Sequence, residues 1–256
     1  MPGIDILQDM ARNVVDAIAK RVFKEHETNF SDFSSEICMG ADGTMTQYID
    51  MVAEQVALDI IGDAANVLSE EAGYIDNGQE YTFVIDPIDG TRNAVNGIPF
   101  YCTSIALGSN RLKDITFGLV RNIPSGDIYW AEKGVGSFLN GNRTQVLPHI
   151  ENPIYILALG NFIDSSTYHI VKKNNIRALG AAALEMSLVG SGAADLYFQG
   201  NEYLRVTDIA ASTLIVREAG GEVYNARGHV LDMGLNLTER SSVLAVASDD
   251  LLEVLQ

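Results

Sequence analysis

Apolar residues recur at helical intervals in two segments near the start of the chain. They fall at every third or fourth position over 5–25, and residues 46–61 repeat the pattern, so both segments are predicted to be amphipathic helices. Short apolar runs bounded by Gly, Asn and Asp follow, and these are typical of strands. The predicted strands lie at 66–69, 81–86, 101–108, 115–121 and 127–131. The middle of the chain therefore predicts a sheet.

Helical and strand-like patterns alternate again after Pro148 and Pro153. The predicted elements are strands at 154–159, 194–199, 222–225 and 243–247, and helices at 166–174, 180–190 and 207–219, the last capped by Thr207. Because helices and strands are interleaved in both halves, the pattern favours a layered α/β or α+β fold over separate all-α and all-β domains. No linker divides the chain, so we expect at most a seam near residue 145, between an N-terminal α+β half, 1–145, and a C-terminal α/β half, 146–256.

Composition narrows the class of protein and its partners. Of 256 residues, 47% are hydrophobic and 20% charged, which predicts a well-filled core. The net charge of −17 argues against a nucleic-acid or anionic membrane partner, because both would be repelled, and an anionic substrate would need a cation. No run of eighteen apolar residues or signal-peptide pattern occurs, and Cys38 and Cys102 form no CxxC pair, so we expect a cytoplasmic protein in a reducing compartment.

The stretch VIDPIDGTRN, residues 84–93, places two carboxylates at the end of a predicted strand. Pro87 has no N–H for a sheet ladder, so the strand should leave its neighbours after Asp86, and Gly90 permits a tight turn. Asp86 and Asp89 can converge across such a turn, and like charges that close repel unless one is protonated or a cation lies between them. An Asp-rich turn in which Asp89 caps a following helix is the alternative.

Two further acidic positions repeat this theme. Glu70 and Glu71 also follow a short apolar run, and because α/β sheets gather functional groups at the carboxyl ends of strands, Glu70 is expected to join Asp86 and Asp89. Asp208 stands in the first turn of a predicted helix, where compensation of the helix dipole is the alternative explanation. A site built only of oxygen ligands favours Mg²⁺ or Mn²⁺ over zinc. With backbone N–H groups at Gly90 for an anion, the pattern suggests phosphate chemistry.

These residues resemble the inositol monophosphatase family of metal-dependent sugar phosphatases, in order and over nearly the whole chain. The resemblance is carried by Glu70-Glu71, the run from Asp86 to Thr91, Asp208 in a segment ending EAGG, and GVGSFLNG at 134–141, which alone would predict a hairpin. GADGTMT at 40–46 and IRALGAAALEM at 176–186 are most similar to archaeal-type members, which hydrolyse fructose 1,6-bisphosphate and inositol 1-phosphate. The resemblance implies a layered α-β-α-β-α sandwich.

The resemblance also implies the metal site and the catalytic residues. The metal ligands would be Glu70, Asp86, the backbone carbonyl of Ile88, Asp89 and Asp208, holding two Mg²⁺ and a third, weaker ion, with Mn²⁺ as a substitute. Glu70 and Thr91 would be catalytic, Thr91 orienting the attacking water. Asp42 is the first choice for the carboxylate that activates the water. Asp50, spaced from Glu54 as in other members, competes with it, although Asp50 could also be an ordinary charge on a helix surface.

On the substrate side the resemblance implies contacts from Asp89, Gly90, Thr91, Arg177, Glu185 and Arg205. Gln199 stands where relatives often carry a carboxylate, and Asn201 stands where archaeal-type relatives tend to carry arginine, so the substrate is left open. A small sugar or polyol phosphate is expected, on a homodimer. The alternatives are a 3′-phosphoadenosine 5′-phosphate or dinucleotide phosphatase and, in another class, a non-catalytic acidic metal-binding regulatory protein.

Overall fold

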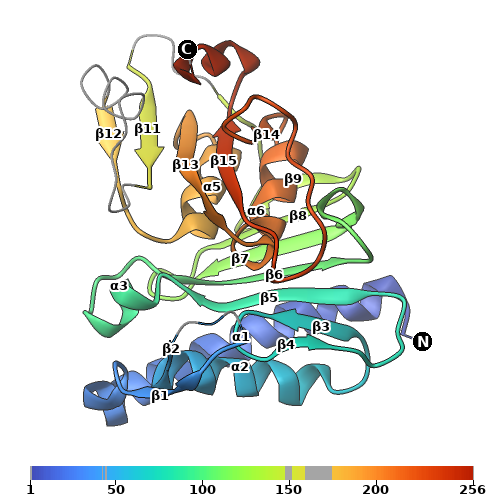
Figure 1. Ribbon diagram of the computed structural model, residues 1–256, viewed down its shortest axis with the longest axis vertical. Helices are drawn as coiled ribbons and strands as arrows, with labels where there is room; N and C mark the ends of the chain where they lie inside the picture. Colours follow the sequence, from blue (N-terminus) through green and yellow to red (C-terminus); the bar gives the residue numbers. More distant parts are fainter. Residues whose placement is uncertain (1, 42, 44, 148–151, 159–174, 256) are drawn as a thin grey trace.

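Helices and sheets alternate in layers in the computed structural model, which describes residues 2–41, 43, 45–147, 152–158 and 175–255 (Figure 1). A layer of two helices covers one face of an eight-stranded sheet. Two more helices separate this sheet from a five-stranded sheet. The outer face of the five-stranded sheet packs, in the described part of the chain, against the 3-10 helix η3 (Asp249–Leu255). The predicted layered α+β fold is confirmed, while the helix predicted at 166–174 lies outside the described residues.

The helix layer consists of α1 (Ile4–Asn29) and α2 (Tyr48–Ile61). Both lie where apolar periodicity predicts them, and the first extends four residues past the predicted end at residue 25. Their apolar faces meet one side of the eight-stranded sheet because burial of nonpolar surface is the main driving force for packing such elements. The fully buried residues of this interface include Leu7, Val14, Ile18, Ile49, Phe83, Ile85 and Phe117.

The eight-stranded sheet has the order β10-β9-β8-β7-β6-β5-β3-β4. Its strands are β3 (Asn66–Ser69), β4 (Gly73–Ile75), β5 (Thr82–Asp89), β6 (Cys102–Gly108), β7 (Phe117–Asn122), β8 (Ile128–Glu132), β9 (Gly136–Leu139) and β10 (Asn142–Thr144). Neighbouring strands are antiparallel except β3 and β5, which run parallel. The five predicted strands are confirmed. The hairpin of β9 and β10 turns at Asn140 and Gly141, which both have positive φ, as a tight hairpin turn requires.

The strand β5 corrects one expectation at the Asp-Pro-Ile-Asp turn. The strand does not end at Asp86 but continues to Asp89. Its pairing with β6 shifts register between these two aspartates, which lie opposite Ser104 and Cys102 respectively. An extra residue on one strand is a β-bulge, and such a bulge tolerates the missing N–H of Pro87 without ending the sheet.

The five-stranded sheet has the order β12-β11-β13-β15-β14. Its strands are β11 (Ile154–Leu157), β12 (Asn175–Arg177), β13 (Leu196–Leu204), β14 (Glu222–Tyr224) and β15 (Ser241–Val246). Between the sheets lie α5 (Ala182–Gly190) and α6 (Val206–Glu218), and nearly every residue of α6 is buried. A Cβ on Gly118 of β7 would lie 2.7 Å from the carbonyl oxygen of Ala211, so glycine lets α6 sit directly on the first sheet.

Four smaller observations complete the fold. The cap of α6 is Arg205 rather than the predicted Thr207, which is itself buried in the first turn. Elements before and after residue 145 contribute separate strands to the two sheets but share the central core, so the division into 1–145 and 146–256 stays a prediction. Among the helices described, none is long and apolar enough to cross a membrane. The remaining short elements are η1 (Phe30–Asp32), η2 (Leu112–Asp114), α3 (Thr91–Val95) and the hairpin of β1 (Glu36–Met39) and β2 (Met45–Gln47).

Candidate active site

Three carboxylates from three different elements converge between the two sheets. Glu70 directly follows β3, Asp86 lies in β5, and Asp208 lies in the first turn of α6. One oxygen of each lies within 4.8 Å of the others. Glu70 and Asp86 meet because β3 and β5 are parallel neighbours, so their carboxyl ends share one edge of the sheet. The start of α6 then brings in Asp208 from more than a hundred residues further along the chain.

Burial makes this group of carboxylates unfavourable without a cation. Asp86 and Asp208 are each only 4% exposed. Burial raises the pKa of Asp86 well above its ordinary value, and the nearby charges of Glu70, Asp89 and Asp208 raise it further. Burial and the charge of Asp208 raise the pKa of Asp89 to about 7. A donor set made only of carboxylate oxygens suits a hard divalent cation, which would relieve this repulsion.

Asp89 and Ile88 lie beside the group and hold the turn in place. The Oδ2 atom of Asp89 accepts a hydrogen bond from the backbone N–H of Ala183 at 2.7 Å, which joins the end of β5 to the start of α5. The N–H of Ile88 donates to Asp86 at 3.1 Å. The carbonyl of Ile88, a predicted metal ligand, accepts the Thr91 hydroxyl at 3.0 Å. The two residues therefore connect the carboxylates to the turn that follows them.

The turn after Asp89 requires glycine and positions a hydroxyl. Gly90 has a φ of 89°, and a Cβ there would approach Ala181 to 3.0 Å, so a side chain would be strained and crowded. The Thr91 hydroxyl lies 2.9 Å from Oδ1 of Asp50. Asp50 is buried, which excludes a surface charge, and burial raises its pKa to about 7, with the hydrogen bond from Thr91 opposing the rise. Asp50 is thus a partner of Thr91, whereas Asp42 lies outside the described residues.

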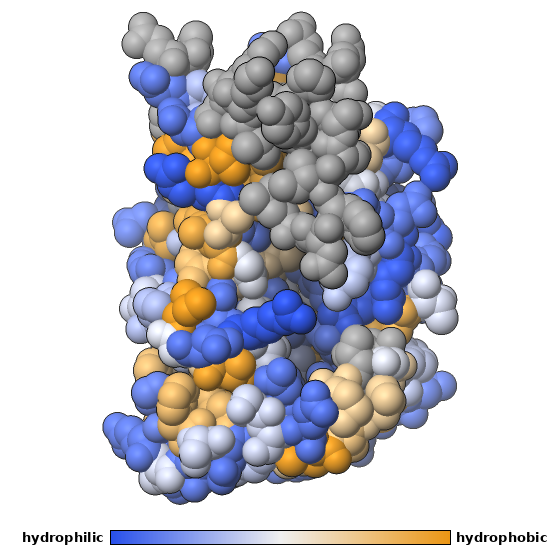
Figure 2. Space-filling view, turned by 60° about the vertical axis from the view of Figure 1, so that its left-hand side comes forward, coloured by the Kyte–Doolittle hydropathy of each residue, from blue (hydrophilic) through white to orange (hydrophobic). Residues whose placement is uncertain are grey.

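An open cleft of about 930 Å³ leads to these groups. Its described lining comprises Met45, Gln47, Asp50, Glu70, Glu71, Gly90, Thr91, Arg92, Asn93, Leu157, Ala158, Ala178, Leu179, Gly180, Gln199, Asn201, Tyr203 and Arg205. Figure 2 shows the side of the molecule on which α3 and β12 lie, where hydrophilic surface alternates with separate apolar patches. The lining comes from segments on both sides of residue 145, so the cleft brings Thr91 and Asp50 together with Arg205.

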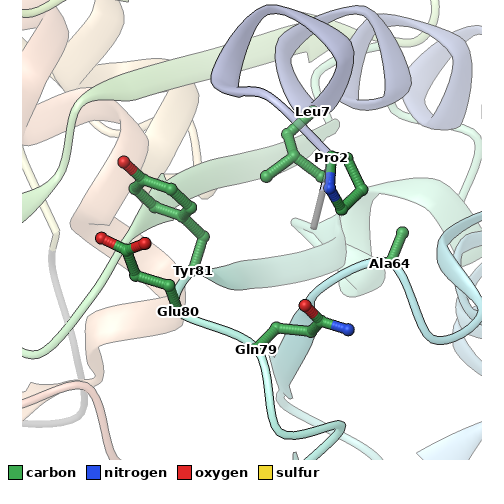
Figure 3. A pocket seen from close by; sticks show the side chains of 6 residues that line it. All are labelled: Pro2, Leu7, Ala64, Gln79, Glu80 and Tyr81. Carbon is green, nitrogen blue, oxygen red and sulfur yellow. The ribbon is translucent and has the colours of Figure 1, made fainter.

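A second, much smaller pocket carries no comparable chemistry. It is lined by Pro2, Leu7, Ala64, Gln79, Glu80 and Tyr81 (Figure 3) and has a volume of about 30 Å³, the share of one water molecule. Tyr81 precedes β5, while Asp86 and Asp89 lie towards the other end of this strand. The small pocket is therefore separate from the carboxylates.

Comparison with known proteins identifies the family. A model of the inositol monophosphatase family matches residues 4–255. The chain belongs to this family. The predicted resemblance is confirmed, and membership makes the chain a phosphoric monoester hydrolase of a metal-dependent family, which the acidic cluster fits.

Individual relatives of this family agree in fold and differ in activity. The chain is 38% identical to a fructose-1,6-bisphosphatase/inositol-1-monophosphatase of Methanothermobacter thermautotrophicus, covering 95% of this chain and 91% of the relative. It is 35% identical to a bifunctional NADP phosphatase/NAD kinase of Methanococcus maripaludis, covering 94% of this chain and 47% of the relative. A solved structure from Pyrococcus horikoshii, described as similar to inositol-1 monophosphatase, has a TM-score of 0.87 and 31% identity over 99% of this chain and 98% of its own. The archaeal-type resemblance is therefore confirmed as well.

The family's expected substrate contacts are distributed unevenly around the cleft. Arg205 lines it, whereas Arg177 is exposed on β12 next to the lining residues and donates to the carbonyl of Ile176. Glu185 is only 1% exposed, and its carboxylate accepts the backbone N–H groups of Leu179 at 2.6 Å and Gly180 at 3.1 Å. The side chain of Glu185 thus supports the loop that lines the cleft, and its predicted contact with substrate stays a prediction.

Sequence reasoning missed three features of the site. Asn93 donates to the carbonyls of Phe100 and Leu179, each at 2.7 Å, and so joins α3 to the loop before α5. Tyr203, which is 64% exposed, lines the cleft beside Gln199 and Asn201. The guanidinium of Arg205 forms an ion pair with Glu70 at 2.6 Å. The position of Asn93 two residues after the Asp-Gly-Thr run was the one local signal for the first of these.

Proposed function

We propose that this chain is a Mg²⁺-dependent phosphomonoesterase that hydrolyses small sugar or polyol phosphates, fructose 1,6-bisphosphate and inositol 1-phosphate among them, as a cytoplasmic homodimer. One observation carries the proposal. Glu70, Asp86 and Asp208 converge, and Glu70 lines a cleft whose wall also holds the hydrogen-bonded pair Thr91 and Asp50. Relatives with these activities cover almost the whole chain.

The proposed cation site uses the buried carboxylates. Glu70, Asp86 and Asp208 would hold Mg²⁺, with Asp89 and the carbonyl of Ile88 as further ligands, and Mn²⁺ suits the same oxygen donors. When bound, Mg²⁺ supplies Lewis-acid neutralisation of phosphate charge and lowers the pKa of a coordinated water. This also answers how an anionic ester approaches a protein with a net charge of −17. The attraction is local and comes from the cation rather than from the protein surface.

The residues of the chain supply positioning and proton transfer. The Thr91 hydroxyl lies within hydrogen-bond distance of Oδ1 of Asp50 and of the carbonyl of Ile88. When it donates to Asp50, its oxygen can accept from the attacking water and orient it, so the water gives its proton to Thr91 as Thr91 passes its own to Oδ1 of Asp50. Gly90 and Thr91 offer backbone N–H groups to the phosphate. Arg92, which lines the cleft next to them, adds a positive charge to the entrance.

A dinucleotide phosphatase is the second candidate, and the wall formed by β13 favours it. Three extra residues of β13 bulge out between Gln199 and Leu204, where its pairing with β15 is interrupted. This segment presents the amides of Gln199 and Asn201 and the exposed ring of Tyr203 to the cleft. Neutral amides and an aromatic ring suit a planar base, because stacking on an aromatic ring binds any base. The NADP phosphatase relatives support the same candidate.

The two candidates are distinguished by direct comparison of substrates. Phosphate release would be measured at equal concentrations of fructose 1,6-bisphosphate, inositol 1-phosphate, 3′-phosphoadenosine 5′-phosphate and NADP⁺, with Mg²⁺ present. We expect the highest kcat/KM for one of the two sugar or polyol esters. A higher kcat/KM for NADP⁺, together with a rise in the KM for NADP⁺ alone in Tyr203→Ala, would replace the first candidate by the second. Release of phosphate from none of the four would contradict both.

A further inference from the structure

The side chain of Arg205 contacts two members of the carboxylate group. Its Nη1 atom lies 2.6 Å from Oε1 of Glu70, and its Nη2 atom lies 3.0 Å from Oδ1 of Asp208. The backbone N–H of Arg205 also donates to Oδ2 of Asp208 at 2.7 Å. The guanidinium thus bridges two of the three carboxylates that form the cation site.

This bridge places a positive charge between Glu70 and Asp208 and so reduces the repulsion between their carboxylates. The side chain of Arg205 is 13% exposed, that of Glu70 is 17% exposed and that of Asp208 is 6% exposed, so solvent screens the pairs weakly. The fork of a guanidinium matches carboxylates in geometry, and its charge cannot be removed near neutral pH. A divalent cation ligated by Glu70 and Asp208 would lie close to this charge, and the two positive charges would repel.

We propose that Arg205 is an internal counter-cation that competes with the divalent cation for Glu70 and Asp208, and that its displaced guanidinium then holds the anionic part of the substrate. The inference rests on the cation site of the proposed function and adds an order of binding to it. Arg205 already lines the cleft, so release from Glu70 leaves its guanidinium facing the substrate. Cation binding would thereby create the substrate site.

The alternative is that Arg205 only orients its two carboxylates as ligands. The two roles predict opposite changes in cation affinity. If Arg205 is a competitor, its removal tightens cation binding, because the carboxylates no longer have to give up the guanidinium when they bind the cation. Removal of an orienting group weakens it, because the ligands become less ordered. The sign of the change in Kd therefore decides between them.

The test is isothermal titration of the chelator-treated protein with MgCl₂, in wild type, Arg205→Met and Arg205→Lys. We expect Arg205→Met to bind Mg²⁺ about tenfold more tightly than wild type, since the coupling free energy of a close charge pair corresponds to at least this ratio of affinities. The Kd of Arg205→Lys for Mg²⁺ should lie between those of wild type and Arg205→Met, because an ammonium cannot bridge both carboxylates in the same way. Arg217→Met is the matched control: Arg217 lies in the last turn of the same helix and pairs with Glu222 at 2.5 Å, so its loss should leave the Kd for Mg²⁺ unchanged.

Thermal unfolding and steady-state kinetics give independent readings. Without Mg²⁺, Arg205→Met should have a lower Tm than wild type, and saturating Mg²⁺ should raise its Tm by more than it raises that of wild type. The KM for the substrate should rise in Arg205→Met although its affinity for Mg²⁺ improves. If the metal-free Arg205→Met protein does not fold, the Kd of Arg205→Lys decides, and tighter binding than in wild type is expected.

Equal or weaker binding of Mg²⁺ by the Arg205 variants would overturn the inference. Failure of the proposed function looks different, because wild type itself would then bind no Mg²⁺ or release no phosphate. Wild type that binds Mg²⁺ and hydrolyses an ester, beside Arg205 variants with unimproved affinity, would refute the competition alone.

Discussion

Replacement of Asp50 by asparagine tests the proposed base directly. Asp50 is 6% exposed, and its Oδ1 atom accepts the Thr91 hydroxyl at 2.9 Å. Asparagine has nearly the same shape and keeps one acceptor oxygen, so Asp50→Asn should preserve the contact with Thr91. The substitution removes the ability to take up a proton. We therefore expect activity to fall while the fold is retained.

The expected loss of activity follows from the role of a general base. Such a group contributes roughly 10²- to 10⁴-fold, so kcat should fall by about that factor, or about 3–5 kcal/mol of barrier. Burial raises the pKa of Asp50 to about 7, and only the ionised form accepts a proton. In wild type kcat/KM should therefore rise with pH up to about 7 and then level off. In Asp50→Asn this rise should be absent.

The same substitution that lowers activity should raise the free energy of unfolding. The folded pKa of Asp50 lies near 7, above the ordinary value of 3.8, so its contribution to folding is complete below pH 3.8 and is lost as the pH rises to about 7. The shift corresponds to at most roughly 4 kcal/mol. Because asparagine does not titrate, the free energy of unfolding of metal-free Asp50→Asn should exceed that of wild type increasingly from pH 4 to pH 7.

The assay is phosphate release with Mg²⁺ between pH 5.5 and 8.5, with urea unfolding in chelator between pH 4 and pH 7. Asp59→Asn is the matched control, because Asp59 is exposed on the same helix and accepts a hydrogen bond from Gln55. It should change kcat by less than about twofold. A reduction of less than about threefold in Asp50→Asn, or an unchanged pH profile, would refute the assignment of Asp50 as base.

Two further substitutions test other parts of the site. Asp89→Asn should lower turnover by several orders of magnitude at saturating Mg²⁺ with an unchanged circular dichroism spectrum, because loss of a ligand charge removes stabilisation of the transition state; near-wild-type turnover would contradict its role as ligand. Gly118→Ala places a Cβ 2.7 Å from the oxygen of the Ala211 carbonyl, so the free energy of unfolding measured in urea should fall by about 1–3 kcal/mol. Its Kd for Mg²⁺ should also weaken as α6 shifts Asp208. Gly3→Ala, with open space around it, should change neither quantity, and equal stability of both variants would contradict the close packing of α6.

The fold was predictable wherever the signal is local. The helices α1 and α2 follow from apolar periodicity, because each buries one face, and the strand β3 follows from a short run that is buried at every residue. The hairpin of β1 and β2 was missed, and β1 is exposed at every residue, so no alternation of apolar and polar residues marks it. The short strands β4 and β12 were also missed, because each has only 3 residues and so shows no apolar pattern of its own.

The acidic residues of the candidate site were predictable from the sequence, but their contacts were not. Asp86 and Asp89 stand in one short motif, the end of a neighbouring predicted strand added Glu70, and the resemblance to a known family supported both Glu70 and Asp208 as members of the same site. The choice between Asp42 and Asp50 could not be made from the sequence, because it depends on which carboxylate reaches Thr91. The hydrogen bond between Asp50 and Thr91 favours the residue that the sequence ranked second. Burial of Glu185 was also not visible, since its neighbours in sequence are those of any small-residue helix.

The net negative charge of the chain and the carboxylates of the site both oppose the binding of an anionic substrate. With a net charge of −17, the protein repels a phosphate ester at long range, and the three carboxylates of the proposed cation site repel it at short range. Arg205 offsets part of that local charge but is held by Glu70 and Asp208 rather than facing the ester. Productive binding of the substrate therefore requires the cation first, and apparent affinity for the ester should rise with Mg²⁺ concentration until the carboxylates are saturated.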